Sequence, residues 1–117
     1  SLVKPIPKKM REEMEKDPFY QVCCITGAIA SPVVKIEWHH NFESYANGNK
    51  GRVNEAWCIL PVTKEVHQNL TNHKEKLNWI MLNRATDEEL HHWSKSENLL
   101  AKRYRLNKIY GNWESRA

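Results

Sequence analysis

The chain has 117 residues and a mass of 13.8 kDa, enough for one compact domain with a modest core and too little for two ordinary ones. A net charge of +4 and an isoelectric point near 9.0 favour a polyanionic partner such as nucleic acid over acidic protein surfaces. Three cysteines indicate a reducing compartment rather than a disulfide framework, and no stretch approaches the roughly 20 apolar residues of a membrane helix, so we expect a cytoplasmic protein with no membrane partner.

The N-terminal segment predicts an extended basic arm, a short helix and a strand. Prolines in residues 1–7 favour the arm, good helix formers run from Lys8 to Lys16, and Asp17-Pro18 ends them. Residues 19–24 favour a strand that leads into a turn at 25–27. We expect one domain over residues 1–117, comprising this arm and helix (1–18), a core (19–73) and a helical extension (74–117).

Two adjacent histidines follow an apolar, β-branched segment. The stretch "SPVVKIEW", from Ser31, predicts a second strand that ends at Trp38, directly before His39 and His40. The Asn- and Gly-rich residues 41–54 predict a loop of about a dozen residues, with the best turn signal at 47–48. "EAWCIL", residues 55–60, is then the partner strand, ended by Pro61, and the two strands make a hairpin.

Helices are predicted for the rest of the chain. Thr63 is a natural N-cap for a short helix that holds His67, and a further helix follows from about residue 73 to 84. "TDEE", residues 86–89, is a capping box that opens a long last helix reaching about residue 109. A buried stripe along it would consist of Leu90, Trp93, Leu100, Tyr104 and Ile109. The predicted fold class is α+β, a hairpin-helix core with an N-terminal helix and two C-terminal helices.

Adjacent histidines at a strand end can have different roles, because successive side chains on an extended backbone point to opposite sides. One imidazole can bind a zinc-like ion while the other, with an ordinary pKa near about 6.5, accepts a proton from water. A metal needs a further protein ligand, and His67 is the candidate that the hairpin would bring close.

This order of motifs resembles the HNH, or ββα-metal, endonuclease family, and its small phage-type members in particular. The matching stretches are "KIEWHHNF", the Asn/Gly loop, "VNEAWCILPVTKEVH" and a flanking "CCITG", about residues 19–73. The resemblance implies a ββα-metal core in which His39 and His67 bind one divalent ion (Mg, Mn, Ni or Zn). It implies His40 and Asn54 as catalytic residues, His40 as the general base and Asn54 as the residue that stabilises the active-site loop or, in some members, binds the metal.

The resemblance also implies the activity, which is metal-dependent hydrolysis of DNA phosphodiester bonds that leaves 5′ phosphates. Nothing in the chain indicates a base-reading element, so we expect nonspecific, nicking or structure-selective cleavage. A role in phage DNA recombination or packaging, in the cytoplasm of a bacterial host, would fit the family.

Two positions in the motif stay open. Asn54 fits the middle position by its place in "VNEAW", whereas the common family spacing counted back from His67 falls on Cys58. The third metal ligand is Thr71, His73 or water. The cysteines do not form two CxxC pairs, so a structural zinc is not expected.

Basic side chains in the two terminal segments and in the loop are candidates for phosphate contacts, although such residues also form ordinary solvated faces. The candidates are Lys8, Lys9, Arg11, Lys50, Arg52, Arg103, Arg105 and Lys108. An alternative function is a noncatalytic nucleic-acid-binding module on a metal-stabilised ββα scaffold. A third is an RNA-directed or toxin-like nuclease, because the metal chemistry does not select the sugar.

Overall fold

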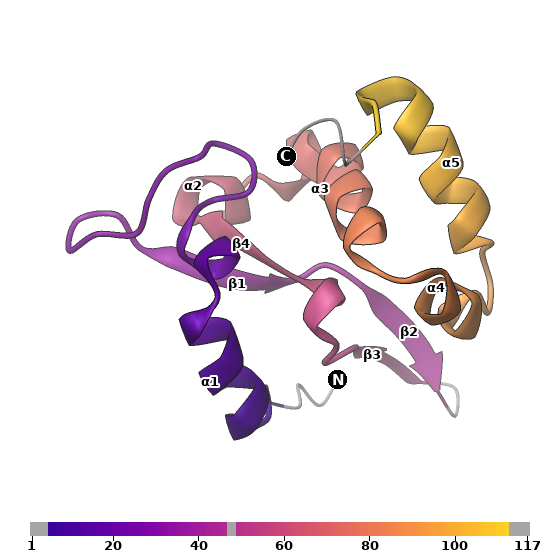
Figure 1. The fold of residues 1–117 in the computed structure, drawn as a ribbon, viewed down its shortest axis with the longest axis horizontal. Helices are drawn as coiled ribbons and strands as arrows, with labels where there is room; N and C mark the ends of the chain where they lie inside the picture. Colours follow the sequence, from indigo (N-terminus) through magenta and orange to yellow (C-terminus); the bar gives the residue numbers. More distant parts are fainter. Residues whose placement is uncertain (1–4, 47–48, 113–117) are drawn as a thin grey trace.

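Two antiparallel strands, β1 (Ile36–His40) and β4 (Ile59–Thr63), lie at the centre of the molecule in the computed structural model. The model describes residues 5–46 and 49–112, with the backbone alone at residues 45, 46, 49 and 50. The register pairs Ile36 with Thr63 and His40 with Ile59. Both strands belong to an α+β fold whose helices pack around them, as the sequence predicts (Figure 1).

Strand β4 separates two clusters of buried side chains. Ile59 packs with Met14 and Tyr20 on the side of helix α1 (Lys8–Lys16), whereas Leu60 and Val62 belong to the main core. This alternation follows from the two-residue period of a strand that is buried on both faces. Figure 1 shows the result, with α1 on one side of the paired strands and α3, α4 and α5 on the other.

The predicted helix over residues 8–16 is confirmed, but the strand predicted after it is wrong. Residues Pro18–Gln21 form a 3-10 turn, because the Asp17 side chain accepts a hydrogen bond from Phe19 N at 2.9 Å and starts a tight turn there. The turn predicted at 25–27 is confirmed, and Gly27 adopts a φ of +78° that favours glycine.

The first strand of the expected hairpin begins later than predicted. Ser31 Oγ accepts hydrogen bonds from the amides of Val33 and Val34, at 3.2 and 3.0 Å, so these residues form a turn instead of extended strand. Strand β1 therefore starts at Ile36 and includes both histidines, which were expected just beyond its end.

The segment predicted as a long loop contains a second hairpin, formed by β2 (Glu43–Ala46) and β3 (Asn49–Arg52). The turn signal predicted at 47–48 lies outside the described residues. Residues Ala56–Cys58 form a 3-10 turn where a strand was expected, and β4 continues through the predicted stop at Pro61. Pro61 is tolerated because its carbonyl accepts from Cys24 N at 2.9 Å, which directs its backbone polar groups away from β1.

The helices after Thr63 and Thr86 begin as predicted, whereas the helix between them begins at Leu70, about three residues before the predicted start near residue 73. Thr63 caps α2 (Lys64–His67), with its hydroxyl accepting from Val66 N at 3.3 Å, and α3 spans Leu70–Arg84. The prediction of a single long last helix is wrong, because the chain forms two helices there, α4 (Asp87–Trp93) and α5 (Leu99–Tyr110). Ser94 ends the first of these, its hydroxyl donating to Leu90 O and accepting from Leu99 N.

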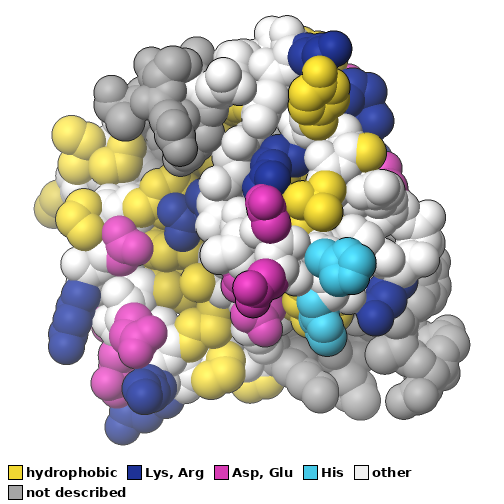
Figure 2. Space-filling model, turned by 45° about the vertical axis from the view of Figure 1, so that its right-hand side comes forward, with side chains coloured by type: hydrophobic (Ala, Val, Ile, Leu, Met, Phe, Trp, Pro, Cys, Tyr) yellow, Lys and Arg dark blue, Asp and Glu magenta, His cyan; other side chains and the backbone are white. Residues whose placement is uncertain are grey.

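This break changes which residues of α5 are buried. Tyr104 and Ile109, expected in the buried stripe, are 65% and 60% exposed, whereas Leu99 and Leu106 are buried in their place. Figure 2 brings the side of α4 and α5 forward, where hydrophobic, acidic, basic and histidine side chains are interspersed on the surface. No helix among residues 5–46 and 49–112 is long and apolar enough to cross a membrane.

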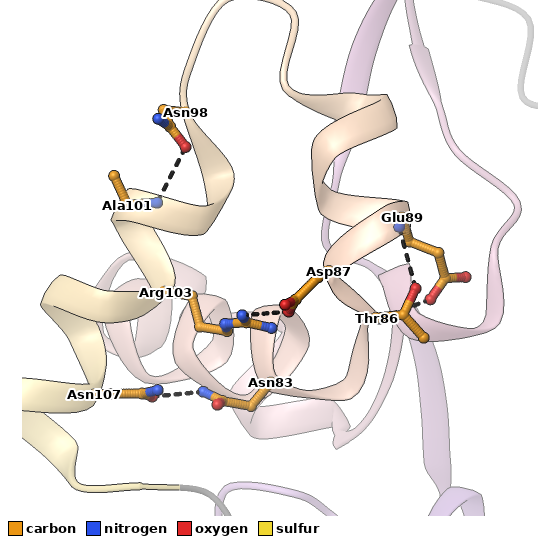
Figure 3. Close-up of polar contacts among 8 residues, drawn as sticks. All are labelled: Asn83, Thr86, Asp87, Glu89, Asn98, Ala101, Arg103 and Asn107. Carbon is orange, nitrogen blue, oxygen red and sulfur yellow. Dashed lines mark hydrogen bonds and ion pairs between the residues drawn. The ribbon is translucent and has the colours of Figure 1, made fainter.

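Polar contacts join α5 to α4 and to α3 (Figure 3). The predicted capping box is confirmed, with Thr86 and Glu89 exchanging side chain to backbone hydrogen bonds at the start of α4. Arg103 of α5 contacts Asp87 of α4 at 2.6 Å, and Asn83 of α3 donates to Asn107 of α5 at 2.8 Å. These contacts hold α3, α4 and α5 together as a helical layer on one side of the strands.

Candidate active site

His39 and His67, predicted as metal ligands, lie together in the structure. His39 is on strand β1 and His67 is the last residue of α2, which directly follows the paired strand β4. Their ring centroids are 5.0 Å apart and the rings are tilted by 59°. The antiparallel pairing and the Thr63 cap produce this approach, because together they return α2 to β1.

Glu37 determines which nitrogen of His67 is available. Glu37 Oε1 lies 2.7 Å from His67 Nδ1, and because a carboxylate only accepts, Nδ1 carries the hydrogen. The lone pair of the neutral ring is then on Nε2, as in the carboxylate–histidine pairs that orient metal ligands. Glu37 lies two residues before His39 on the same strand, so both side chains project from the same face towards α2.

A similar arrangement determines which ring nitrogen of His39 carries the hydrogen and which keeps the lone pair. Its Nε2 lies 3.2 Å from Asn41 Oδ1, while Asn41 Nδ2 donates to Asn78 Oδ1 at 3.0 Å and to Met81 Sδ at 3.4 Å. Because a thioether can only accept, the amide of Asn41 presents its oxygen to His39. His39 Nε2 therefore carries the hydrogen, and the lone pair of the neutral ring is on Nδ1.

Asn41, Asn78 and Met81 were not predicted from the sequence to belong to the site, and the spacing of Met81 predicted only a core residue. Asn41 directly follows the histidine pair, and this adjacency was a usable signal. Asn78 and Met81 lie three residues apart on α3, and nothing in their local sequence indicates that this helix packs against the end of β1. Glu37 contacts His67 and so orients one of the two predicted ligands.

The pKa of His39 is lowered from 6.5 to about 4. Burial is the largest cause, followed by the nearby His67, and the positive charges of His40 and Arg52 act in the same direction. The hydrogen bond to Asn41 opposes the shift. His39 is therefore neutral at neutral pH, which is the form of imidazole that binds a metal.

His40 faces a different set of neighbours from His39. Its Nε2 lies 2.7 Å from Asn54 Oδ1, and Asn54 Nδ2 donates to the carbonyl of Pro5 at 3.1 Å. The two adjacent histidines thus have separate partners, as expected for successive residues on a strand. Cys58, the other candidate for the middle position of the motif, is fully buried in the core, whereas Asn54 contacts His40.

The donor set fits a metal site that has few protein ligands. No group of three or more His, Cys, Asp or Glu side chains that could hold a metal is present in the described part of the chain. Thr71 is exposed on α3 and His73 lies further along the same helix, and neither has a described contact with His39 or His67. Two imidazoles, one oriented by a carboxylate and the other by an amide, match the nitrogen ligands that zinc-group ions accept.

The predicted phosphate-binding residues are spread over the surface. Lys8 and Arg11 on α1 form exposed pairs with Glu12 and Glu15, while Lys9 is exposed beside them. Arg52 on β3 is exposed and acts electrostatically on His39, whereas the side chain of Lys50 lies outside the described residues.

The three predicted residues on α5 differ from one another. Arg103 contacts Asp87 and is turned towards α4, so this residue contributes to the helical layer. Arg105 is exposed, and Lys108 Nζ lies 4.7 Å from the centre of the exposed Tyr104 ring. Arg105 and Lys108 are therefore the α5 cations that a polyanion can reach.

Comparisons with known proteins find no match for this chain, whether among family models, curated proteins or solved structures.

Proposed function

We propose that this protein is a metal-dependent endonuclease of the HNH type, with β1, β4 and α2 as its ββα-metal core. The observation that carries the proposal is the approach of His39 and His67, whose rings lie 5.0 Å apart, beside a third histidine with separate partners. One divalent ion bound by the first two histidines would stabilise negative charge on the phosphate and on the leaving oxygen.

The side chains supply the remaining chemistry. Glu37 and Asn41 hold His67 and His39 in the tautomers that leave Nε2 and Nδ1 as metal-binding nitrogens. His40, with Nε2–H donated to Asn54, has its lone pair on Nδ1 and takes the proton of the attacking water there. Because the described residues bring two candidate protein ligands together, water and phosphate oxygens would complete the coordination of a magnesium, manganese, nickel or zinc ion.

DNA is the substrate that we propose, and its backbone provides most of the affinity. The exposed cations of α1, with Arg52 near the site and Arg105 and Lys108 on α5, can neutralise phosphates without reading sequence. Because such phosphate contacts do not read sequence, we expect nonspecific, nicking or structure-selective cleavage. Recombination or packaging of phage DNA is a process in which cleavage of this kind would serve.

Plasmid cleavage by EDTA-stripped protein, with magnesium, manganese, nickel or zinc added back separately, tests the proposal. Wild type should nick or linearise the plasmid in at least one metal, and His40→Ala and His67→Ala should each lower the rate by about 10²-fold or more. His91→Ala is the matched control, because His91 is exposed on α4 and lies outside the site.

Failure of the wild type to cleave DNA in any of the metals, with DNA binding retained, would contradict the enzyme and support the noncatalytic binding module. Cleavage of RNA but not of DNA by the wild type would correct the substrate and retain the metal site. Equal loss in His91→Ala and His40→Ala would show that the loss reflects histidine removal in general and would contradict the assigned roles.

A further inference from the structure

The extended arm before α1 contacts the residue that holds His40. Asn54 Nδ2 donates to the carbonyl of Pro5 at 3.1 Å, and Asn54 Oδ1 lies 2.7 Å from His40 Nε2. Pro5 and His40 therefore contact the two ends of one amide group. Asn54 is 49 residues from Pro5 and 14 residues from His40 in the sequence, so these contacts join three separate segments of the chain.

The direction of each hydrogen bond in this chain follows from the Pro5 carbonyl. A backbone carbonyl can only accept, so the Asn54 amide must turn its NH₂ group towards Pro5. The amide oxygen then faces His40, and since that oxygen can only accept, His40 Nε2 must carry the hydrogen. If the amide were turned over, its NH₂ group would face Nε2 and the hydrogen of the neutral ring would move to Nδ1.

We propose that the arm is a positioning element of the site, because it fixes the Asn54 amide and thereby the tautomer of His40. With the arm in place, Nδ1 of His40 holds the lone pair and can accept a proton. Without it, the Asn54 amide loses the Pro5 acceptor that favours this orientation, and the ring spends a larger part of its time with Nδ1 already protonated. Asn54 is a positioning residue here, and its role as such rests on the proposed nuclease function.

The arm is anchored by packing close to the Pro5 contact. Ile6 packs against the buried cluster of Met14, Tyr20 and Ile59, and the carbonyl of Pro7 accepts from Arg11 N at 2.9 Å in the first turn of α1. Ile59 is also the residue of β4 that pairs with His40. The anchor and the histidine thus share one strand pair, so the position of the Pro5 carbonyl relative to His40 is defined by the core.

A full-length variant with Pro5→Gly and Ile6→Gly loosens the arm, because it removes the fixed φ of proline and the anchoring side chain. The matched control is Pro32→Gly with Val33→Gly, which also replaces a proline and the β-branched residue after it by glycine. These two residues lie in a loop in which Val33 is 91% exposed. Asn54→Ala removes the amide group that contacts Pro5 and His40. Asn54→Asp keeps acceptor oxygens for His40 and has no NH₂ group to orient. In this variant the tautomer of His40 should therefore not depend on the arm.

The first readout is the ring of His40 in metal-free, ¹⁵N-labelled protein, where two-bond ¹H–¹⁵N spectra report which nitrogen carries the hydrogen. Wild type and the loop control should show His40 as the Nε2–H tautomer. The loosened arm and Asn54→Ala should both move the two ¹⁵N shifts towards an average of the two tautomers. A wild-type ring protonated on Nδ1, or identical spectra for wild type and the loosened arm, would overturn the proposal.

The second readout is cleavage, measured with the metal affinity in parallel. Loosening the arm should lower the cleavage rate in proportion to the lost Nε2–H population, about twofold, with metal affinity unchanged, and the same change in an Asn54→Asp background should have little further effect. Equal losses in the wild-type and Asn54→Asp backgrounds would overturn the coupling. Because the spectra need no activity, a wild type that does not cleave leaves the tautomer test intact and contradicts only the proposed function.

Discussion

Burial and the neighbouring His67 ring hold His39 in its neutral form, and this has a consequence for stability. In the unfolded chain His39 takes up a proton at its ordinary pKa of 6.5, whereas in the folded protein it does so only at about 4. Between these values the unfolded state binds more protons, so the free energy of unfolding of the metal-free protein falls as the pH drops from about 6.5 towards 4.

The expected loss from His39 is on the order of 3 kcal/mol at most, and above pH 6.5 this residue contributes no pH dependence. Urea denaturation at a series of pH values, in the presence of EDTA, measures it. The His39→Gln variant should show a shallower decline over this range than wild type. Parallel declines in the two proteins would contradict the assigned environment of His39.

Glu37 provides a second test at the scale of one residue, since its carboxylate holds His67 at 2.7 Å. Glu37→Ala should weaken zinc or nickel binding by about 10- to 100-fold, because His67 loses the group that fixes its tautomer and ring orientation. Isothermal titration calorimetry measures the affinity. Glu65→Ala removes an exposed carboxylate from α2 and should bind as wild type does, and equal affinities for all three proteins would refute the role of Glu37.

Helix α4 depends on its capping box, whose Thr86 hydroxyl accepts from Glu89 N at 3.1 Å. Thr86→Ala should lower the free energy of unfolding by about 1 kcal/mol, because an amide of the first turn loses its partner. Ser96→Ala, an exposed serine in the bend after α4, is the control and should be nearly neutral. Urea denaturation compares them, and equal stability of Thr86→Ala and wild type would contradict the cap.

The exposed cations of helix α5 lead to a prediction about DNA binding. Arg105 and Lys108 lie on its exposed side, and no acidic residue occurs anywhere in α5. Replacing both by Ala should weaken DNA binding and reduce the slope of log K against log salt concentration by about 0.9 for each lost phosphate contact. The double variant Lys74→Ala, Lys95→Ala loses the same charge elsewhere on the surface. Identical slopes for the two double variants would contradict a specific role for α5.

Secondary structure was predictable where a local signal decides it and was wrong where side chains override the pattern. Proline and the Thr63 and Thr86 caps locate the ends of α1 and the starts of α2 and α4 correctly. The β-branched residues before Ile36 suggested strand, but the Ser31 hydroxyl closes a turn there. Ser94 likewise divides the predicted last helix by bonding to backbone groups on both sides, a choice that periodicity alone cannot show.

At the scale of the whole molecule, the site depends on segments that are remote in sequence. Strand β1 carries His39 and His40, α2 carries His67, and Asn54, just before the 3-10 turn that leads into β4, meets the arm at Pro5. The histidines were predictable because an adjacent pair in a strand and one helix form a recognisable order. The contributions of Asn41, Asn78 and Pro5 were not, because they arise only when α3 and the arm pack around the strands.

We propose that His39 and His67 share one divalent ion while His40 does not bind it. Isothermal titration calorimetry of EDTA-stripped protein with zinc or nickel tests this most directly, with wild type, His39→Ala, His67→Ala and His40→Ala titrated side by side. The structure leads us to predict one ion per chain, bound by wild type and His40→Ala with similar affinity and lost in the other two variants. Binding that survives in His39→Ala and His67→Ala, or is lost in His40→Ala alone, would contradict the claim.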